Sequence, residues 1–196
     1  MAMWARYAGL GLAAIVAGVG FAAYQVRSGG LGDDIRSGVW SSGRDVGTAQ
    51  SDMRTRAVVA LRGLLALPKT EARYFSATQD SSGRRLSGKC SYTVSGGAMP
   101  ARWWSITVYD PAGWLIVNRW NRHSIGSGAV AAAGTSQWAF SISPSEPADQ
   151  SANLWVPTGT SGPIELTLRA YRPTGALADD PASVTFPAIT RTGCVA

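Results

Sequence analysis

An uncharged segment of 20 residues lies between Arg6 and Arg27. As a helix that rises 1.5 Å per residue, it spans the roughly 30 Å hydrocarbon core of a bilayer. Aromatic residues stand near both ends, where amphipathic rings favour the membrane interface. The pattern predicts one transmembrane helix over residues 4–26 within an anchor of residues 1–27.

A cleaved secretory signal is the alternative to an anchor, because Gly20-Phe21-Ala22 is similar to a small-residue cleavage site. The apolar region of a signal usually runs about 7–15 residues. The segment here is longer, so its length favours an uncleaved anchor.

The orientation of the anchor has two interpretations. Arg27, Arg36 and Arg44 follow the helix, and the positive-inside rule would then keep the domain in the cytoplasm. Large domains, however, translocate largely regardless of charge, and the leader before the helix is short. We expect a bacterial inner-membrane protein with its globular domain in the periplasm.

Small residues at four-residue spacing form a ridge along the predicted helix. They are Ala5, Gly9, Ala13 and Ala17. Such a ridge is typical of contacts between transmembrane helices, although Gly and Ala are also common in these helices generally. It predicts a membrane-protein partner. Two GxGxxA runs within the same helix do not indicate a nucleotide site, because that motif needs a strand before it.

The remaining chain has the composition of one folded domain. Of all 196 residues only 15% are charged, against about 25% in an average soluble protein. Residues 28–50 are polar and rich in Gly and Ser, which is typical of a linker. Residues 51–196 are expected to form a helix followed by a β-sandwich.

An amphipathic helix is predicted before the sandwich. Ser51 or Asp52 caps it, and Pro68 stops it at Leu67. Its apolar stripe is expected to pack on the domain that follows. The stripe consists of Met53, Ala57, Ala60, Leu61, Leu64 and Leu67.

After Pro68 the hydrophobic period changes to two, which indicates strands separated by Gly/Pro turns. Asp110-Pro111-Ala112-Gly113 predicts a type I turn, with residues 114–117 returning as a hairpin partner. The pattern predicts a mainly β, jelly-roll-like antiparallel β-sandwich. The inward residues are expected at Cys90, Tyr92, Val94, Trp104, Ile106, Val108, Trp138, Phe140, Ile142, Ile164, Leu166 and Leu168.

Several runs in this order resemble one family. They are Tyr74-Phe75 through Asp80 and Gly83, WWSITVYD at 103–110, Asn118 with Arg122, NLWVP at 153–157 and LTLRAYRP at 166–173. The family is the bacterial domain of unknown function 1214, usually found beside or fused to domain of unknown function 1254. The resemblance covers roughly residues 38–191 and fits a short form with one membrane helix. It implies a jelly-roll-like β-sandwich and brings no established reaction.

The chain departs from the family pattern in two loops. The family commonly reads Asn-Trp-Leu-Pro where residues 153–157 are one residue longer, and Asp-Gly-Ser where residues 133–136 read AGTS. If these loops form a ligand site in longer relatives, the resemblance implies an altered site here.

The sequence holds no recognisable catalytic or metal-binding set. His123 is the only histidine, no GxSxG motif is present, and the acidic pairs 33–34 and 179–180 are sequence neighbours. A zinc site needs three or four ligands, and a nucleophilic serine needs a base and its partner. We therefore expect no catalytic residue, no metal and no cofactor, with His123 in a loop hydrogen bond.

Arginines and aromatic residues recur together in the second half of the chain. A rim for an anionic or sugar-like ligand is one interpretation, since Arg forks grip carboxylates and aromatic faces stack on rings. Mutual support of Arg and Trp on strand faces is the other. No nucleic-acid partner is expected, because no RNA-binding motif is present. The candidate ligand residues are Arg119, Arg122, His123, Arg169 and Tyr109.

The two cysteines predict a disulfide between Cys90 and Cys194. Cys90 shares the strand parity of the core residues, and a bond to it would hold the C-terminal segment against the sandwich. Two free thiols would be expected instead in a cytoplasmic domain, so this prediction rests on the compartment.

Together these features predict a membrane-anchored periplasmic β-sandwich that acts as a binding or scaffolding module, as in an accessory subunit of a membrane complex. The alternative is a hydrolase or lyase acting on envelope carbohydrate or lipid. A deep pocket at Arg122, His123 and a carboxylate would favour the enzyme. A flat apolar patch near the membrane would favour the partner role.

Overall fold

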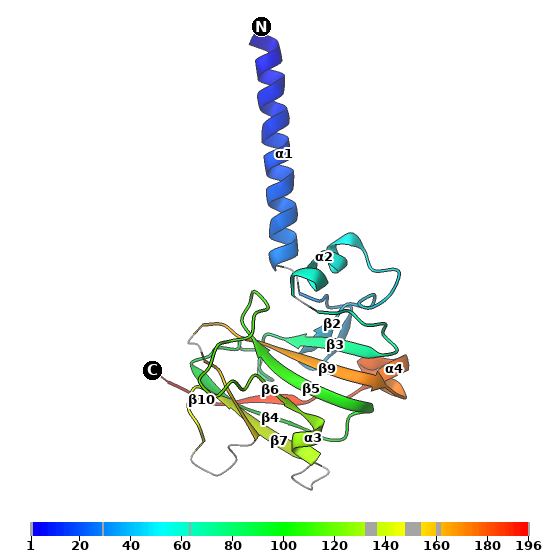
Figure 1. The fold of residues 1–196 in the computed structure, drawn as a ribbon, viewed down its shortest axis with the longest axis vertical. Helices are drawn as coiled ribbons and strands as arrows, with labels where there is room; N and C mark the ends of the chain where they lie inside the picture. The colour runs from blue at the N-terminus through cyan, green and yellow to red at the C-terminus, as the bar shows by residue number, and fades with distance from the viewer. Residues whose placement is uncertain are drawn as a thin grey trace.

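The computed structural model describes residues 2–28, 30–62, 64–131, 137–147, 154–159 and 162–195. Helix α1 (Ala2–Ser28) stands away from the folded domain (Figure 1). Its segment Arg6–Arg27 has a mean hydropathy of 1.7 and is not buried against the rest of the molecule. A helix of this length and composition can anchor a chain in a membrane.

The predicted ridge of small residues on α1 is exposed. Gly9, Ala13 and Ala17 are exposed, and a Cβ added at Gly9 would meet nothing within 4 Å in the described residues. The side chain of Ala5 lies outside the described residues. The membrane-protein partner stays a prediction.

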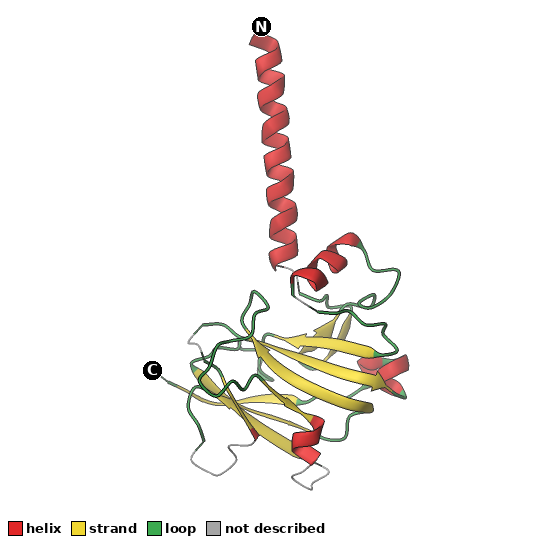
Figure 2. Cartoon of the chain, viewed as in Figure 1, coloured by secondary structure: helices red, strands yellow, loops and turns green. Residues whose placement is uncertain are grey.

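The strands of the described residues form two sheets, which lie as separate layers in Figure 2. All neighbouring strands are antiparallel except β7 and β8, which are parallel. The first sheet has the order β1 (Ile35–Ser37), β2 (Trp40–Ser42), β3 (Ala72–Ala77), β9 (Glu165–Pro173), β5 (Ala101–Tyr109) and β6 (Ser124–Gly126). The second has the order β10 (Ala188–Cys194), β4 (Cys90–Gly96), β7 (Trp138–Ser143) and β8 (Trp155–Pro157).

The main core fills the space between the two sheets. Cys90, Tyr92 and Val94 are buried on β4, as the period of two predicts. The rings of Trp104 and Trp138 come from opposite sheets and lie 4.4 Å apart between centroids. The remaining inward positions predicted from the sequence are buried as well. The mainly β fold is therefore confirmed.

The segment interpreted as a linker is part of the domain. It contributes β1 and β2, which extend the first sheet beyond β3. Trp40 is buried, and its Nε1 donates to the carbonyl of Pro187 at 2.7 Å. Leu31 and Val46 pack with Tyr74 in a second, smaller core. This segment folds onto the domain because burial of the Trp40 ring stabilises it: a Trp side chain removes roughly 150–250 Å² of surface from water.

Helix α2 (Met53–Leu61) begins as predicted and then departs from the prediction. Asp52 caps it by accepting a hydrogen bond from the backbone N–H of Thr55 at 2.6 Å. The helix ends at Leu61, shortly before Gly63 in the sequence, rather than at Leu67. A glycine costs a helix about 1 kcal/mol relative to alanine.

The expected packing of the apolar stripe of α2 is wrong for four of its six residues, because Ala60 is exposed together with the three large side chains named next. Leu64 is buried, but Met53, Leu61 and Leu67 are exposed. Within α2 the buried side chain is that of Val58. The early helix end changes the direction of the chain, so one face no longer carries the whole stripe.

The predicted turn at Asp110 is confirmed, but the hairpin is not. The Gly113 N–H donates to the Asp110 carbonyl at 3.0 Å, and Gly113 has a φ of +87°, which favours glycine. Residues 114–117 make a single bridge to β5, between Leu115 and Tyr109. On the side of β5 away from β9, the ladder partner is instead β6. The other helical turns are α3 (Ser127–Ala131), α4 (Ala176–Asp179) and η2 (Pro181–Ser183).

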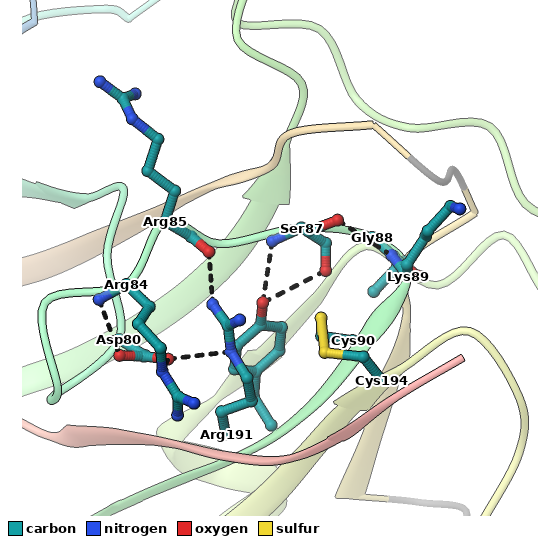
Figure 3. Close-up of a disulfide and its surroundings, with 11 residues drawn as sticks. Asp80, Arg84, Arg85, Ser87, Gly88, Lys89, Cys90, Arg191 and Cys194 are labelled. Atoms are coloured by element: carbon teal, nitrogen blue, oxygen red, sulfur yellow. Dashed lines mark hydrogen bonds and ion pairs between the residues drawn. A yellow bond between two sulfur atoms is a disulfide. The ribbon is translucent and has the colours of Figure 1, made fainter. Parts of the chain in front are cut away.

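The predicted disulfide is present between Cys90 and Cys194 (Figure 3). The two residues face each other at the ends of β4 and β10, with their Cα atoms 3.9 Å apart. Cys90 itself is buried in the main core. The bond therefore ties the last strand to the central part of the second sheet.

Removal of this disulfide should destabilise the domain by up to about 4–5 kcal/mol, since a closed loop of about 100 residues restricts the unfolded chain by that amount. The measurement is urea denaturation of the full chain in detergent, with and without a reductant. A double variant Cys90→Ala, Cys194→Ala should unfold at the lower urea concentration in both conditions. A reductant that leaves the wild-type curve unchanged, or peptide mapping that finds both thiols free, would contradict the bond.

Candidate functional site

A cleft of about 650 Å³ lies between the end of α1 and the first sheet. Its walls come from the start of the domain, from α2, from the segment between β3 and β4, and from the turn after β5. Figure 1 places α2 and the turn after β5 at the end of the domain nearest α1. We call this cavity the arginine cleft, after the side chains that line it.

The arginine cleft is strongly basic. Its lining contains five arginines against two carboxylates, Asp33 and Glu165. The arginines are Arg27, Arg36, Arg54, Arg62 and Arg85. Within the described part of the chain, the side chains of Arg27 and Arg85 form no hydrogen bond or ion pair. Guanidinium groups with donors still available match the geometry of carboxylates and phosphates.

The two carboxylates differ in their surroundings. Asp33 pairs with Arg36 at the surface, where both side chains are about two-thirds exposed, so this pair contributes little to stability. Glu165 is buried at the start of β9 and forms an ion pair with Arg62. Burial raises the pKa of Glu165, and the charge and hydrogen bond of Arg62 only partly offset this effect. The pair joins α2's end to the floor of the cleft.

Asp80 organises the turn beside the cleft. Its buried carboxylate accepts backbone hydrogen bonds from Ser82 at 2.9 Å and Arg84 at 3.1 Å. It also pairs with Nε of Arg84 at 3.2 Å and Nε of Arg191 at 2.9 Å. Burial raises the pKa of Asp80, but the two backbone hydrogen bonds and the two arginine charges outweigh it, so the pKa lies below its ordinary value.

The same network positions Arg85 in the cleft wall. Arg191 of β10 donates to the backbone carbonyl of Arg85, and Arg85 forms a bridge with Gln79, another lining residue. Figure 3 shows the Arg85 side chain pointing away from Asp80 and Arg191. The backbone of Arg85 is thus held by the network while its guanidinium is left for the cleft.

Three of the candidate ligand residues lie in the loop between β5 and β6. Asn118 organises this loop: its Nδ2 donates to the carbonyl of Arg122 at 2.9 Å, and its Oδ1 accepts from the Arg122 N–H at 3.1 Å. His123 lies with Nδ1 3.3 Å from Asn118 Nδ2 and Nε2 3.2 Å from Asn121 Oδ1. A neutral imidazole protonated on Nε2 satisfies both contacts. Arg119 stacks over Trp120, 4.1 Å from its ring centroid.

The other two candidates lie together on the outer face of the first sheet. Arg169 of β9 donates to the hydroxyl of Tyr109 at 2.8 Å and to that of Thr107 at 3.3 Å. Its guanidinium also lies 5.4 Å from the Tyr109 ring centroid. This is the mutual support of Arg and aromatic residues that the sequence left as an alternative.

None of the five candidate residues is among the described residues that line the arginine cleft. The described residues also contain no cluster of three or more His, Cys, Asp or Glu side chains able to hold a metal ion. The loop departures at 133–136 and Asn153 lie outside the described residues.

The family comparison is consistent with the motifs. The family described as "Protein of unknown function (DUF1214)" matches residues 71–175, just over half of the chain. The chain belongs to this family. The matched region of this DUF1214 chain includes Arg85 and Glu165, whereas the other four arginines of the cleft precede it.

Two solved structures are similar to this DUF1214 chain. The VPA0106 protein from Vibrio parahaemolyticus is 23% identical, with a TM-score of 0.58, and the match covers 79% of this chain and 39% of that one. A putative uncharacterized protein from Burkholderia cenocepacia is 15% identical, with a TM-score of 0.37 over 63% of this chain and 29% of that one. No curated protein matches the chain. The Vibrio structure supports the fold, and this chain spans well under half of its length.

The sequence interpretation missed the arginine cleft. The available signal is the density of arginines directly after the apolar segment, which we used only to argue the orientation of the anchor. Arg62, Arg85 and Glu165 are distant in the sequence, and no periodicity links them.

Asp80→Asn should destabilise the domain by about 1.5–3 kcal/mol, the usual range for a hydrogen bond to a charged group. The amide still caps the turn, but Arg84 and Arg191 lose their counter-ion. Because the folded pKa of Asp80 is lowered, its stabilisation is present above the unfolded value of about 3.9 and is lost as the pH falls through the folded value. Urea denaturation from neutral to acidic pH measures the loss and its pH dependence.

Asp110→Asn is the matched control for this experiment. Asp110 also begins a turn and accepts hydrogen bonds from two backbone N–H groups, those of Ala112 and Trp114. In the described residues it has no ion pair with an arginine. We expect a change below about 0.5 kcal/mol. Equal losses in the two variants would contradict a role for the Asp80 ion pairs.

Proposed function

We propose that this protein is a single-pass inner-membrane protein whose β-sandwich lies in the periplasm and binds an anionic group in the arginine cleft. In this proposal it acts as a binding or scaffolding module, as an accessory subunit of a membrane complex does. The observation that carries the proposal is the excess of five arginines over two carboxylates in one cleft next to the anchor.

The chemistry of the cleft supports binding of carboxylate or phosphate groups. Its carboxylates are already engaged, Asp33 by Arg36 and Glu165 by Arg62. Arg27 and Arg85 retain their donors among the described residues. An anion entering the cleft therefore meets a positive field without displacing an internal ion pair.

The proposed location rests on two features. Helix α1 can anchor the chain, and the disulfide between Cys90 and Cys194 fits an oxidising compartment. The strands alternate between the two sheets along much of the chain, and we propose a jelly-roll-like arrangement for them.

A hydrolase or lyase is the rival proposal, and it requires a cavity that converges on Arg122, His123 and a carboxylate. The described lining of the arginine cleft contains neither Arg122 nor His123. Both ring nitrogens of His123 are within hydrogen-bond distance of asparagine side chains of the same loop. These contacts favour binding over catalysis as the proposed role.

Binding is tested with inorganic pyrophosphate as the probe, by titration calorimetry of the full chain in nanodiscs of uncharged lipid. Arg54→Gln combined with Arg85→Gln should weaken binding about tenfold or more, because charge-assisted hydrogen bonds to the anion are lost. Both arginines are exposed, so the fold should tolerate the changes.

The control removes two other exposed arginines, Arg102→Gln with Arg119→Gln, and lowers the net charge equally. We expect an affinity within about twofold of wild type, since distant surface charges are largely screened at ordinary salt. Absence of wild-type binding, or equal weakening by both pairs, would contradict an anion site in the cleft.

The orientation is tested separately by reporter fusions after Ala196. A phosphatase that is active only in the periplasm should be active there, and a reporter that works only in the cytoplasm should be silent. The reverse pattern would place the domain in the cytoplasm and remove the compartment argument for the disulfide.

A further inference from the structure

Several large apolar side chains at the α1 end of the domain are exposed to solvent. On α2 and just after it, Met53 is 88% exposed and Leu65 is 86% exposed, and Leu61 is exposed between them. In the loop after β5, Trp114 is 71% exposed and Leu115 is about half exposed. Large apolar groups gathered at one end of a molecule are typical of an interaction surface.

The two segments that carry these side chains are neighbours. A Cβ added at Gly113 would lie 3.4 Å from Cα of Arg62, so the turn after β5 packs against the end of α2. Arg62 and Pro111 also line the arginine cleft together with Arg27, the last residue of the candidate membrane span. Figure 1 shows α2 beside the end of α1 and the loop after β5 rising toward the same end.

We propose that this membrane-contacting surface, formed by Met53, Leu61, Leu65, Trp114 and Leu115, inserts into the interface of the bilayer that α1 crosses. The proposal rests on the proposed membrane anchorage, but neither on the side of the membrane nor on anion binding. Since the span ends at Arg27 beside α2, the lipid headgroups begin at the level of this surface.

The chemistry of the surface fits a lipid interface. Trp114 has an amphipathic ring of the kind that gathers at the headgroup level, and the leucines and methionine supply apolar contact. Arg54 is exposed on α2, where its guanidinium can reach lipid phosphates. A bilayer is the occupant that continuity with α1 selects, and a protein partner on the same surface is the competing outcome of the test.

Insertion gives the domain one orientation on the membrane. Two contacts besides α1, one from α2 and one from the loop after β5, then fix how the domain is tilted relative to the bilayer. The arginine cleft is then held at the depth of the lipid headgroups, because Arg27, Arg54 and Arg62 line it.

The test uses an environment-sensitive fluorophore on a cysteine introduced as Met53→Cys in the full chain. Both native cysteines are in the disulfide, so only the new thiol is labelled without reductant. The protein is reconstituted in nanodiscs of phosphatidylethanolamine and phosphatidylglycerol, with and without spin-labelled lipid. We expect a blue-shifted emission and quenching by the spin-labelled lipid at least about twofold.

Ala129→Cys is the matched control. Ala129 is exposed on α3, which Figure 1 places at the end of the domain far from α1. Its label should emit as in water and resist quenching. In the Met53→Cys background, Leu61→Ser with Leu65→Ser should reduce quenching, whereas Val195→Ser, which removes an exposed apolar residue elsewhere, should not.

A water-like, unquenched label at position 53 in these partner-free nanodiscs would overturn the proposal and leave a protein partner as the occupant. Co-migration of the chain with the nanodiscs reports on the anchor itself. Failure at position 53 with intact co-migration therefore rejects insertion of the surface without affecting the anchorage, the fusion results or pyrophosphate binding.

Discussion

The connection of β10 to the segment between β3 and β4 is the constraint on which the site depends. Cys194 bonds to Cys90 at the end of the two strands, and Arg191 reaches across to the buried Asp80. The disulfide joins the end of β10 to β4, and beyond an irregularity at Arg191–Gly193 the ladder continues with Arg191 opposite Tyr92, where its guanidinium meets the buried carboxylate. A buried charge without a partner destabilises a fold far more than a surface ion pair stabilises it. The disulfide and the Asp80–Arg191 ion pair therefore support each other.

From that connection the polar architecture extends to the arginine cleft. Arg191 fixes the backbone of Arg85 and leaves its side chain for the cleft, while Glu165 of β9 fixes Arg62 from the other side. Two buried carboxylates thus hold the walls, and the guanidinium groups of Arg27 and Arg85 are left for a ligand. The cleft lies at the end of the molecule where α1 would enter a bilayer, beside apolar side chains that the domain does not cover.

Most strands were predictable because their signal is local. Tyr92, Val94 and Trp104 face the core at the positions that alternation predicts, and Asp110 caps the expected turn. The wrong predictions concern two segments whose structure is set by contacts with residues distant in the sequence. Buried Trp40, which donates a hydrogen bond to the Pro187 carbonyl, holds the glycine-rich segment in the sheet. Strand β6, rather than residues 114–117, pairs with β5. The five candidate ligand residues were identified by type, and their contacts place them in two separate groups.

The sequence by itself determined the apolar helix before the domain, the β-rich class, the strand faces and the family, and it offered one partner for each cysteine. The helix and the class follow from composition, the strand faces from a period of two, and the family from motifs in a fixed order. Only the tertiary structure decided that Arg54, Arg62 and Arg85 share a cleft, that Asp80 meets Arg191, and that Met53 and Trp114 remain exposed beside α1. Those outcomes depend on strand order and on where the chain turns back, and both are set by packing across the whole domain rather than by neighbouring residues.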